Sequence, residues 1–124
     1  MKKLSTKWFK KWAKKANLSD HTLREAINNL EAGSATSSLG NHLHKIRIKR
    51  THSGKSSGFR TILVYKEKDR AIFIYGFAKN EKANISKVEL QYFKKLGADL
   101  LGLPTDQLKK SIQRKILFDL EVEK

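Results

Sequence analysis

The sequence has no cysteine, a single proline, few acidic residues and no long apolar segment. Without cysteine, disulfide bonds and zinc fingers are excluded. The longest apolar run, residues 71–78, is far shorter than the roughly 20 residues that a membrane-spanning helix needs. Residues 1–18 are basic but have neither the apolar centre nor the cleavage site of a secretory signal. We therefore expect a cytoplasmic protein with no membrane partner.

Acidic residues are scarce relative to basic ones: 12 Asp and Glu stand against 27 Lys and Arg, for a net charge of +15. The 124 residues are 39% hydrophobic, which is enough for the core of one small globular domain, residues 1–124. Such an excess of positive charge favours a polyanionic partner, because phosphate releases counterions when Lys and Arg neutralise it. Two acid-free segments hold most of the excess: residues 1–17, with seven lysines, and residues 41–60, with six Lys or Arg.

Two amphipathic helices are predicted at the start of the chain. An apolar residue recurs at every fourth position from Leu4 to Ala16, which is a helical period. We expect this stripe to cover the domain core, although a lysine-rich helix with two tryptophans also suits an anionic membrane surface. Ser19 or Asp20 can cap the second helix, and Gly33 suits its end. Together the two helices would form a hairpin.

The apolar period changes from that of a helix to that of a strand after residues 33–40, which are rich in Gly, Ser and Thr and are expected to form a loop. Three strands are predicted after it, joined by a turn-rich connection (residues 51–58) and a short turn (residues 67–69), which gives an antiparallel meander. They cover residues 42–50, 59–66 and 70–78.

Two helices and a last strand are predicted at the end of the chain. Ser86 and Glu89 have the spacing of a capping box, and the following apolar stripe is Val88, Tyr92, Phe93, Leu96 and Leu100. Pro104 opens a shorter helix, and the final strand has Ile116, Phe118, Leu120 and Val122 on its apolar side. The expected fold class is therefore α+β: an N-terminal helical hairpin packed on a small twisted antiparallel β-sheet, with C-terminal helices and a final strand.

Two weaker motifs are interpreted conservatively. Gly54-Lys55-Ser56 is similar to the end of a phosphate-binding loop, but Lys49 occupies the position of the required first glycine and a strand follows instead of a helix. We interpret it as a basic loop able to approach a nucleic-acid backbone. His42 and His44 could share a metal ion, but no third ligand is near in sequence, which favours a hydrogen-bonded His44. His52 is a candidate proton carrier near neutral pH.

The strongest pattern is a group of cations expected to converge on one face of the sheet. Three share one side of the first long strand, one lies in the next loop and two lie at the ends of the following strands. They are Lys45, Arg47, Lys49, Lys55, Arg60 and Lys79. A solvated basic face without chemistry is the plain alternative, but charges at the ends of core strands are held more firmly than charges on loops.

Such a cluster suits the cleavage of RNA without a metal ion or other cofactor. When a 2′-OH attacks the adjacent phosphorus, the protein must accept a proton, neutralise the pentacoordinate phosphate and assist departure of the 5′ oxygen. Arginine suits the second task, because its planar fork bonds two phosphate oxygens at once. Lysine can serve the first or the third, because neighbouring positive charges disfavour its protonated form.

Several sequence blocks resemble the RelE/ParE superfamily of bacterial type II toxins, and more narrowly its HigB-like RelE branch. They follow in order over nearly the whole chain: Thr6-Lys7-Trp8-Phe9, Leu39-Gly40, Lys45-Ile46-Arg47, residues 54–61, residues 75–81 and Asn84-Ile85-Ser86. The resemblance implies a toxin that enters the ribosomal A site and cuts mRNA. It also implies a cognate antitoxin, often a helix-turn-helix protein, that silences the toxin.

The resemblance implies roles for four catalytic residues. Lys45 would accept the proton, with Arg47 as its paired cation, Arg60 would stabilise the phosphate, and Lys79 would support the transition state or the leaving group. Contacts to RNA are expected from Lys49, Arg50, Lys55 and Lys82, and from Lys10 and Lys14 of the first helix against ribosomal RNA.

Two alternatives remain open within the resemblance. The place of a RelE tyrosine is held by Ile85, so that Tyr75 or Tyr92 would have to stack on the RNA base instead. The superfamily also contains ParE-type gyrase poisons that do no RNA chemistry. A non-catalytic binder, either a gyrase poison or a basic nucleic-acid-binding module, is therefore the alternative function.

Overall fold

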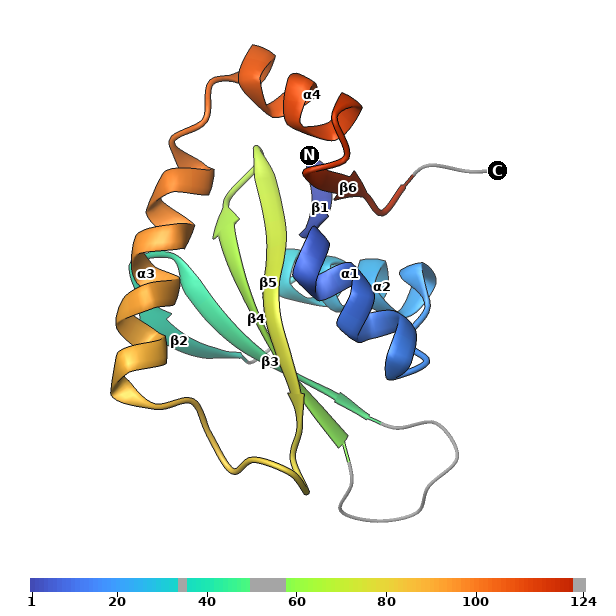
Figure 1. Cartoon of the computed structure of the whole chain (residues 1–124), viewed down its shortest axis with the longest axis vertical. Coiled ribbons are helices and arrows are strands. Elements are labelled where there is room, and N and C mark those ends of the chain that lie inside the picture. The colour runs from blue at the N-terminus through green and yellow to red at the C-terminus, as the bar shows by residue number, and fades with distance from the viewer. Residues whose placement is uncertain (34–35, 50–57, 122–124) are drawn as a thin grey trace.

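A computed structural model of the chain describes residues 1–33, 36–49 and 58–121. Within these residues the chain is α+β, with four helices and one mixed sheet of six strands in the order β2-β3-β4-β5-β1-β6 (Figure 1). The strands are β1 (Lys2–Thr6), β2 (Ser37–Gly40), β3 (Leu43–Lys49), β4 (Gly58–Lys66), β5 (Arg70–Ala78) and β6 (Leu117–Asp119). The helices are α1 (Lys7–Lys15), α2 (Asp20–Glu31), α3 (Lys87–Leu101) and α4 (Thr105–Gln113). No helix in the described ranges is long and apolar enough to cross a membrane.

The centre of the sheet is the antiparallel meander β3-β4-β5 that the sequence predicts. The expectation of a wholly antiparallel sheet is wrong, because β1 runs parallel to β5 and also pairs antiparallel with β6. Strand β2 is not predicted: it lies in the segment expected to be a loop and pairs with β3. Its four residues are mostly polar, so they show no apolar alternation.

A strand precedes the two N-terminal helices, which corrects the predicted start of the fold. Leu4, assigned to the helical stripe, lies in β1 and is fully buried. Helix α1 begins only at Lys7, and the Thr6 side chain caps it by accepting a hydrogen bond from the Phe9 N–H (3.2 Å). The helices α1 and α2 follow one another as expected, but the sheet strand β1 precedes both of them in the chain.

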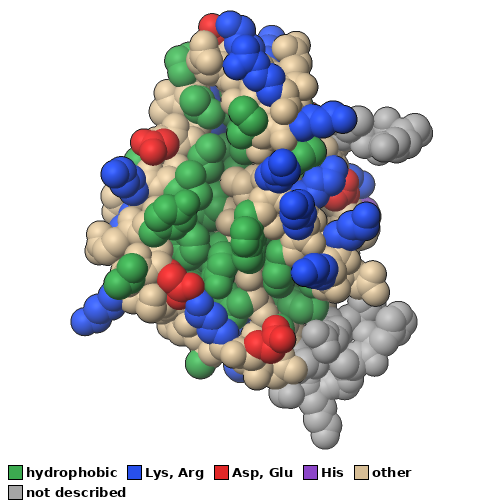
Figure 2. All heavy atoms as spheres, viewed as in Figure 1, with side chains coloured by type: hydrophobic (Ala, Val, Ile, Leu, Met, Phe, Trp, Pro, Cys, Tyr) green, Lys and Arg blue, Asp and Glu red, His purple; other side chains and the backbone are tan. Residues whose placement is uncertain are grey.

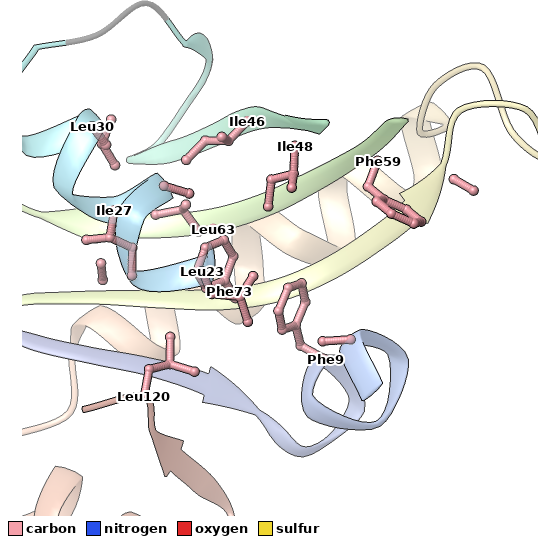
Figure 3. Packing of buried hydrophobic residues seen from close by; sticks show 14 residues of the cluster. Phe9, Leu23, Ile27, Leu30, Ile46, Ile48, Phe59, Leu63, Phe73 and Leu120 are labelled. Carbon is pink, nitrogen blue, oxygen red and sulfur yellow. The ribbon is translucent and has the colours of Figure 1, made fainter. Parts of the chain in front are cut away.

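Two apolar layers cover opposite faces of the sheet. Helices α1 and α2 cover one face, where Phe9 stacks on Phe73 with ring centroids 4.8 Å apart (Figure 3). Helix α3 covers the other face, where Phe93 joins the same buried cluster as Leu43 and Ile62. Because side chains alternate along a strand, β3 contributes to both layers.

Two glycines allow the helices to approach the sheet closely. A Cβ atom on Gly97 of α3 would lie 2.3 Å from Cγ1 of Val64, so this helix could not rest on β4 with any larger residue there. A Cβ atom on Gly76 of β5 would lie 2.3 Å from the Trp12 ring of α1. These contacts fix α1 and α3 on the two sides of the central strands.

Both ends of α3 have polar partners. Ser86 and Glu89 form the predicted capping box at its start. At its end, the buried Arg70 guanidinium donates to the carbonyl oxygens of Leu100 (3.0 Å) and Leu103 (2.7 Å). These carbonyls would otherwise lack partners at the helix end. The predicted apolar stripe of α3 is only partly inward, because Val88 and Tyr92 are exposed.

The final strand is shorter than predicted, and its predicted apolar side is only partly buried. Ile116, assigned to that side, is 57% exposed, whereas Leu120 of the same side is 3% exposed and Leu117, assigned to the other side, is 2% exposed. The reason lies one residue earlier, where Lys115 has a left-handed φ of 61° after α4. This turn sets which side chains point inward, and alternation alone does not reveal it. Helix α4 itself follows Pro104 as predicted.

Candidate functional site

The strand register brings the predicted cations together on one face. Arg47 of β3 lies directly opposite Arg60 of β4, and Lys45 and Lys49 are the neighbours of Arg47 on the same side of β3. This is the side on which Leu43 is buried against the α3 layer. Arg47 and Lys49 are exposed, whereas Lys45 and Arg60 are half-buried. The structure therefore places four predicted cations in one group at the end of the β3–β4 ladder.

Lys79 joins this group from the third strand. It directly follows β5, and its backbone N–H donates to the carbonyl oxygen of Gly58 (3.0 Å). Gly58 in turn lies opposite Lys49. We define the cationic face as Lys45, Arg47, Lys49, Arg60 and Lys79. Six other residues named in the predictions lie outside the described residues: Arg50, His52, Gly54, Lys55, Ser56 and Val122.

The electrostatics of the face suit an anion. The pKa of Arg60 is lowered from its ordinary value, first by burial and then by the charge of Arg47. Two guanidinium groups opposite one another repel, and a bound phosphate would relieve that repulsion by bonding both.

Asn84 contacts the face, although sequence reasoning gave it no role in the site. Its Oδ1 atom accepts a hydrogen bond from Lys45 Nζ (3.3 Å) and another from the Ile85 N–H (2.9 Å). The two side chains are 39 residues apart in sequence. An asparagine ahead of a capping box signals the end of a loop, but nothing local identifies its partner on another strand.

Lys82, predicted to contact RNA, is engaged inside the protein. Its ammonium donates to the Glu89 carboxylate and to the Tyr75 hydroxyl (3.2 Å). The hydrogen bond between Lys82 and Glu89 is the main cause that raises the pKa of Lys82. It is also the main cause that lowers the pKa of Glu89. An RNA contact by Lys82 stays a prediction that would require this pair to open.

The two tyrosines considered for base stacking differ in their surroundings. The Tyr75 ring contacts Trp8 and Phe93, each with centroids 4.8 Å from its own. Tyr92 is exposed on α3. Tyr75 is therefore already stacked within the protein, whereas Tyr92 is accessible.

Lys10 and Lys14 belong to a different surface. Both lie on α1, the helix that covers the face of the sheet opposite α3. Lys10 Nζ lies 4.3 Å from the centre of the Phe118 ring, a cation–π contact. The structure thus does not bring these lysines into the cationic face.

His44 is half-buried and hydrogen-bonded, as favoured from the sequence. Its Nδ1 lies 3.2 Å from Thr36 Oγ1, and its ring meets Tyr65 edge to face. Burial is the first cause that lowers the pKa of His44, and His42 adds to it. In the part of the chain that the structure describes, no three His, Cys, Asp or Glu side chains are grouped to hold a metal ion.

Comparison with known proteins adds one match. The family model for the RelE toxin of the RelE/RelB toxin-antitoxin system matches residues 1–120. No curated protein matches the chain. The matched stretch contains the whole cationic face and Asn84.

Proposed function

The chain belongs to the RelE toxin family, and from this premise we propose that it is a ribosome-dependent mRNA endonuclease. Family membership makes it the toxin of a type II toxin-antitoxin pair, with a cognate antitoxin as partner. The observation that carries the enzymatic proposal is the placement of Arg47 opposite Arg60 with Lys45 beside them on one sheet face. The HigB-like branch, a helix-turn-helix antitoxin and action on cytoplasmic ribosomes are the finer parts of the proposal.

The proposed reaction is cleavage of one RNA phosphodiester bond through attack by the 2′-OH of the adjacent ribose. The 2′ oxygen bonds to phosphorus and loses its proton, while the bond from phosphorus to the 5′ oxygen breaks and that oxygen gains a proton. The products are a 2′,3′-cyclic phosphate and a 5′-hydroxyl end. Charge accumulates on the equatorial phosphate oxygens at the midpoint, and preorganised donors aimed at those oxygens lower the barrier most.

The residues of the cationic face divide these tasks. Arg60 and Arg47 would bond the phosphate oxygens, because paired guanidinium groups match their geometry. Lys45 would take the proton from the 2′-OH as the general base. Lys79, at the far side of the face, would give a proton to the departing 5′ oxygen. No step in this scheme needs a metal ion or a cofactor.

Mapping of mRNA 5′ ends tests the proposal. The wild type, Arg60→Ala and a control, Arg114→Ala, are expressed from an inducible promoter, and 5′ ends are mapped after induction. Arg114 is an exposed arginine at the end of α4, outside the cationic face. We expect new ends within reading frames for the wild type and the control, and none for Arg60→Ala. Growth arrest by the wild type without new ends would contradict the proposal and favour the gyrase-poison alternative.

A further inference from the structure

Exposed apolar side chains gather in one groove outside the cationic face. Among the described residues, four large hydrophobic side chains are strongly exposed: Trp8 (49%), Val88 (80%), Tyr92 (62%) and Ile116 (57%). Trp8, Tyr92 and Ile116 line the same groove of about 560 Å³. Figure 2 shows this apolar surface in the middle of the molecule, between α3 and α1 and over β5. We call it the Trp8 groove.

The groove is held open by packing below it. Its lining includes Tyr75, which stacks on Trp8 and contacts the Phe93 ring at a tilt. The Tyr75 hydroxyl accepts from Lys82, which also pairs with Glu89 at the groove wall. An apolar surface of this kind on a soluble domain marks an interaction site. Because the walls are fixed by these contacts, the surface is ready to receive a partner without rearrangement.

We propose that the Trp8 groove is the docking site for an amphipathic α-helix of the antitoxin, with an apolar stripe flanked by acidic residues. This proposal rests on family membership and not on the cleavage chemistry. A helix lying in the groove fits better than a strand added to β5, because α1 covers the edge of β5 where such a strand would pair. Pairing of β1 with β5 stops at Phe73, and beyond it Trp8 stacks on Tyr75.

The charges around the groove indicate which side chains should flank the apolar stripe of the partner helix. Lys7 lines the groove, and exposed lysines stand one helical turn later at Lys11 and beside the wall residue Ile116 at Lys115. Figure 2 shows Lys and Arg side chains along one side of the apolar surface. The acidic wall residue, Glu89, is already paired with Lys82. Acidic side chains beside the apolar stripe would therefore complement this rim.

A protein partner fits the groove better than RNA does. Unpaired bases bind by stacking on open aromatic faces. The Tyr75 ring already contacts Trp8, Phe77 and Phe93, and one face of Trp8 is taken by Tyr75, so Tyr92 is the open aromatic ring of the groove. The cations suited to phosphate are grouped on the cationic face instead.

Binding of the full-length antitoxin of the same pair tests this assignment. Tyr92→Glu and Ile116→Glu place a negative charge in the groove, and Val88→Glu is the matched control on α3 outside the groove lining. All three positions are exposed, so the variants should fold. By calorimetry we expect the two groove variants to lose at least about 100-fold in antitoxin affinity, and the control to change by less than about 3-fold. Cells should then stay arrested by the groove variants even when antitoxin is co-expressed.

Three results would overturn the assignment. One is antitoxin affinity equal among Tyr92→Glu, Ile116→Glu and Val88→Glu. Another is a wild-type dimer in light scattering that the groove variants abolish, which would make a second copy of the chain the occupant. The third is a loss of ribosome binding in the groove variants, which would assign the surface to the ribosome.

A separate observation concerns Lys45. The segment between β5 and α3 is anchored on both sides of Asn84, by the Lys82–Glu89 pair and by the Ser86 cap of α3. Asn84 thereby reaches across to Lys45 Nζ from a fixed position. We propose that Asn84 is a positioning residue that orients the Lys45 amine toward the 2′-OH, an inference that rests on the proposed function.

An amide oxygen suits this task better than a carboxylate. It accepts one N–H from the amine and adds no negative charge that would hold the lysine protonated. The charged or titratable groups on the neighbouring elements of this face are Arg47 and Lys49 on β3, Arg60 on β4, Tyr75 on β5, and Lys79, Glu81, Lys82 and Glu89 after β5. The Glu89 carboxylate is bonded to Lys82, whereas the partner that Lys45 Nζ contacts is the neutral Asn84 amide.

The pH dependence of cleavage separates positioning from a structural role. Asn84→Asp can keep both hydrogen bonds but adds a charge, Asn84→Ala removes both bonds, and Asn80→Asp is the charge-matched control in the same segment. Single-turnover cleavage of ribosome-bound mRNA is measured against pH. We expect Asn84→Asp to move the rising limb to higher pH by about one unit. Asn84→Ala should lower the rate about 10-fold or more without moving the limb.

Two failures are distinguishable in this experiment. If the wild type cleaves and the Asn84→Asp profile coincides with those of the wild type and of Asn80→Asp, the positioning role is refuted. If the wild type itself does not cleave ribosome-bound mRNA at any pH, the proposed function fails and the positioning role falls with it.

Discussion

Arg60 lies directly opposite Arg47 across the β3–β4 ladder, at the end of the sheet where Lys45 and Lys49 are also grouped. Like charges at facing positions destabilise a sheet, so the fold maintains this pair at a cost in stability. The same arrangement presents two planar donor groups to one anion. The same two residues should therefore lower the free energy of unfolding and bind the phosphate in the proposed reaction.

Relief of this repulsion should stabilise the free protein. We expect Arg47→Gln to raise the free energy of unfolding by a few tenths of a kcal/mol, within the range of about 0.2–1 kcal/mol for facing pairs, and more at low salt. Lys49→Gln is the control, because Lys49 faces Gly58 and relieves no such pair. Urea unfolding measures both variants. Equal stability changes would show that Arg47 and Arg60 do not interact.

Gly76 should be intolerant of a side chain. Its Cβ would lie 2.3 Å from the Trp12 ring, so Gly76→Ala should lower the free energy of unfolding by about 1–3 kcal/mol. In a double-mutant cycle with Trp12→Leu, the smaller side chain should recover part of this loss. Purely additive effects would mean that the Trp12 contact is not the cause.

Arg70 should contribute to stability through the end of α3. Arg70→Met leaves the carbonyl oxygens of Leu100 and Leu103 without their charged donor, and we expect a loss of about 1.5–3 kcal/mol. The exposed Arg114 serves as control, and Arg114→Met should stay within about 0.5 kcal/mol of the wild type. Urea unfolding measures both variants. Equal free energies of unfolding for Arg70→Met and Arg114→Met would show that the Arg70 hydrogen bonds do not stabilise the fold.

The Lys82–Glu89 pair should give a pH-dependent stability. Because the pKa of Glu89 is lowered in the folded protein, its contribution is complete above the ordinary glutamate value of 4.5. It is lost as the pH falls from there through the lower folded pKa. Glu89→Gln keeps a capping-box side chain and removes the charge. The wild type should therefore be more stable than Glu89→Gln at pH 7, and the difference should shrink in acid; a difference that is constant with pH would exclude this linkage.

The elements with strong local patterns are the ones that the sequence predicts. The meander β3-β4-β5 follows from alternation, and the start of α3 follows from the spacing of Ser86 and Glu89. Strand β1 is not predicted because Leu4 also fits a helical stripe with Trp8. The parallel partner of β1 is β5, which begins only at Arg70. A pairing over that separation leaves no local pattern.

The candidate site was predictable in part for the same reason. Alternation along β3 predicts that Lys45, Arg47 and Lys49 share a side, and the register of β4 places Arg60 opposite Arg47. Asn84 depends on how a connecting segment is folded, which side-chain type alone does not reveal. Trp8, assigned to the core, is half-exposed because α1 begins after β1 and turns this ring toward Tyr75.

The most direct measurement of the central claim is cleavage of ribosome-bound mRNA by the purified protein and by Arg60→Ala, with ribosome affinity measured in parallel. We predict that the wild type produces new 5′-hydroxyl ends. Arg60→Ala should cleave at least about 100-fold more slowly, because the lost interaction is strongest in the transition state, while its ribosome affinity changes by less than about 10-fold. Cleavage by Arg60→Ala at the wild-type rate, or no cleavage by the wild type, would contradict the account.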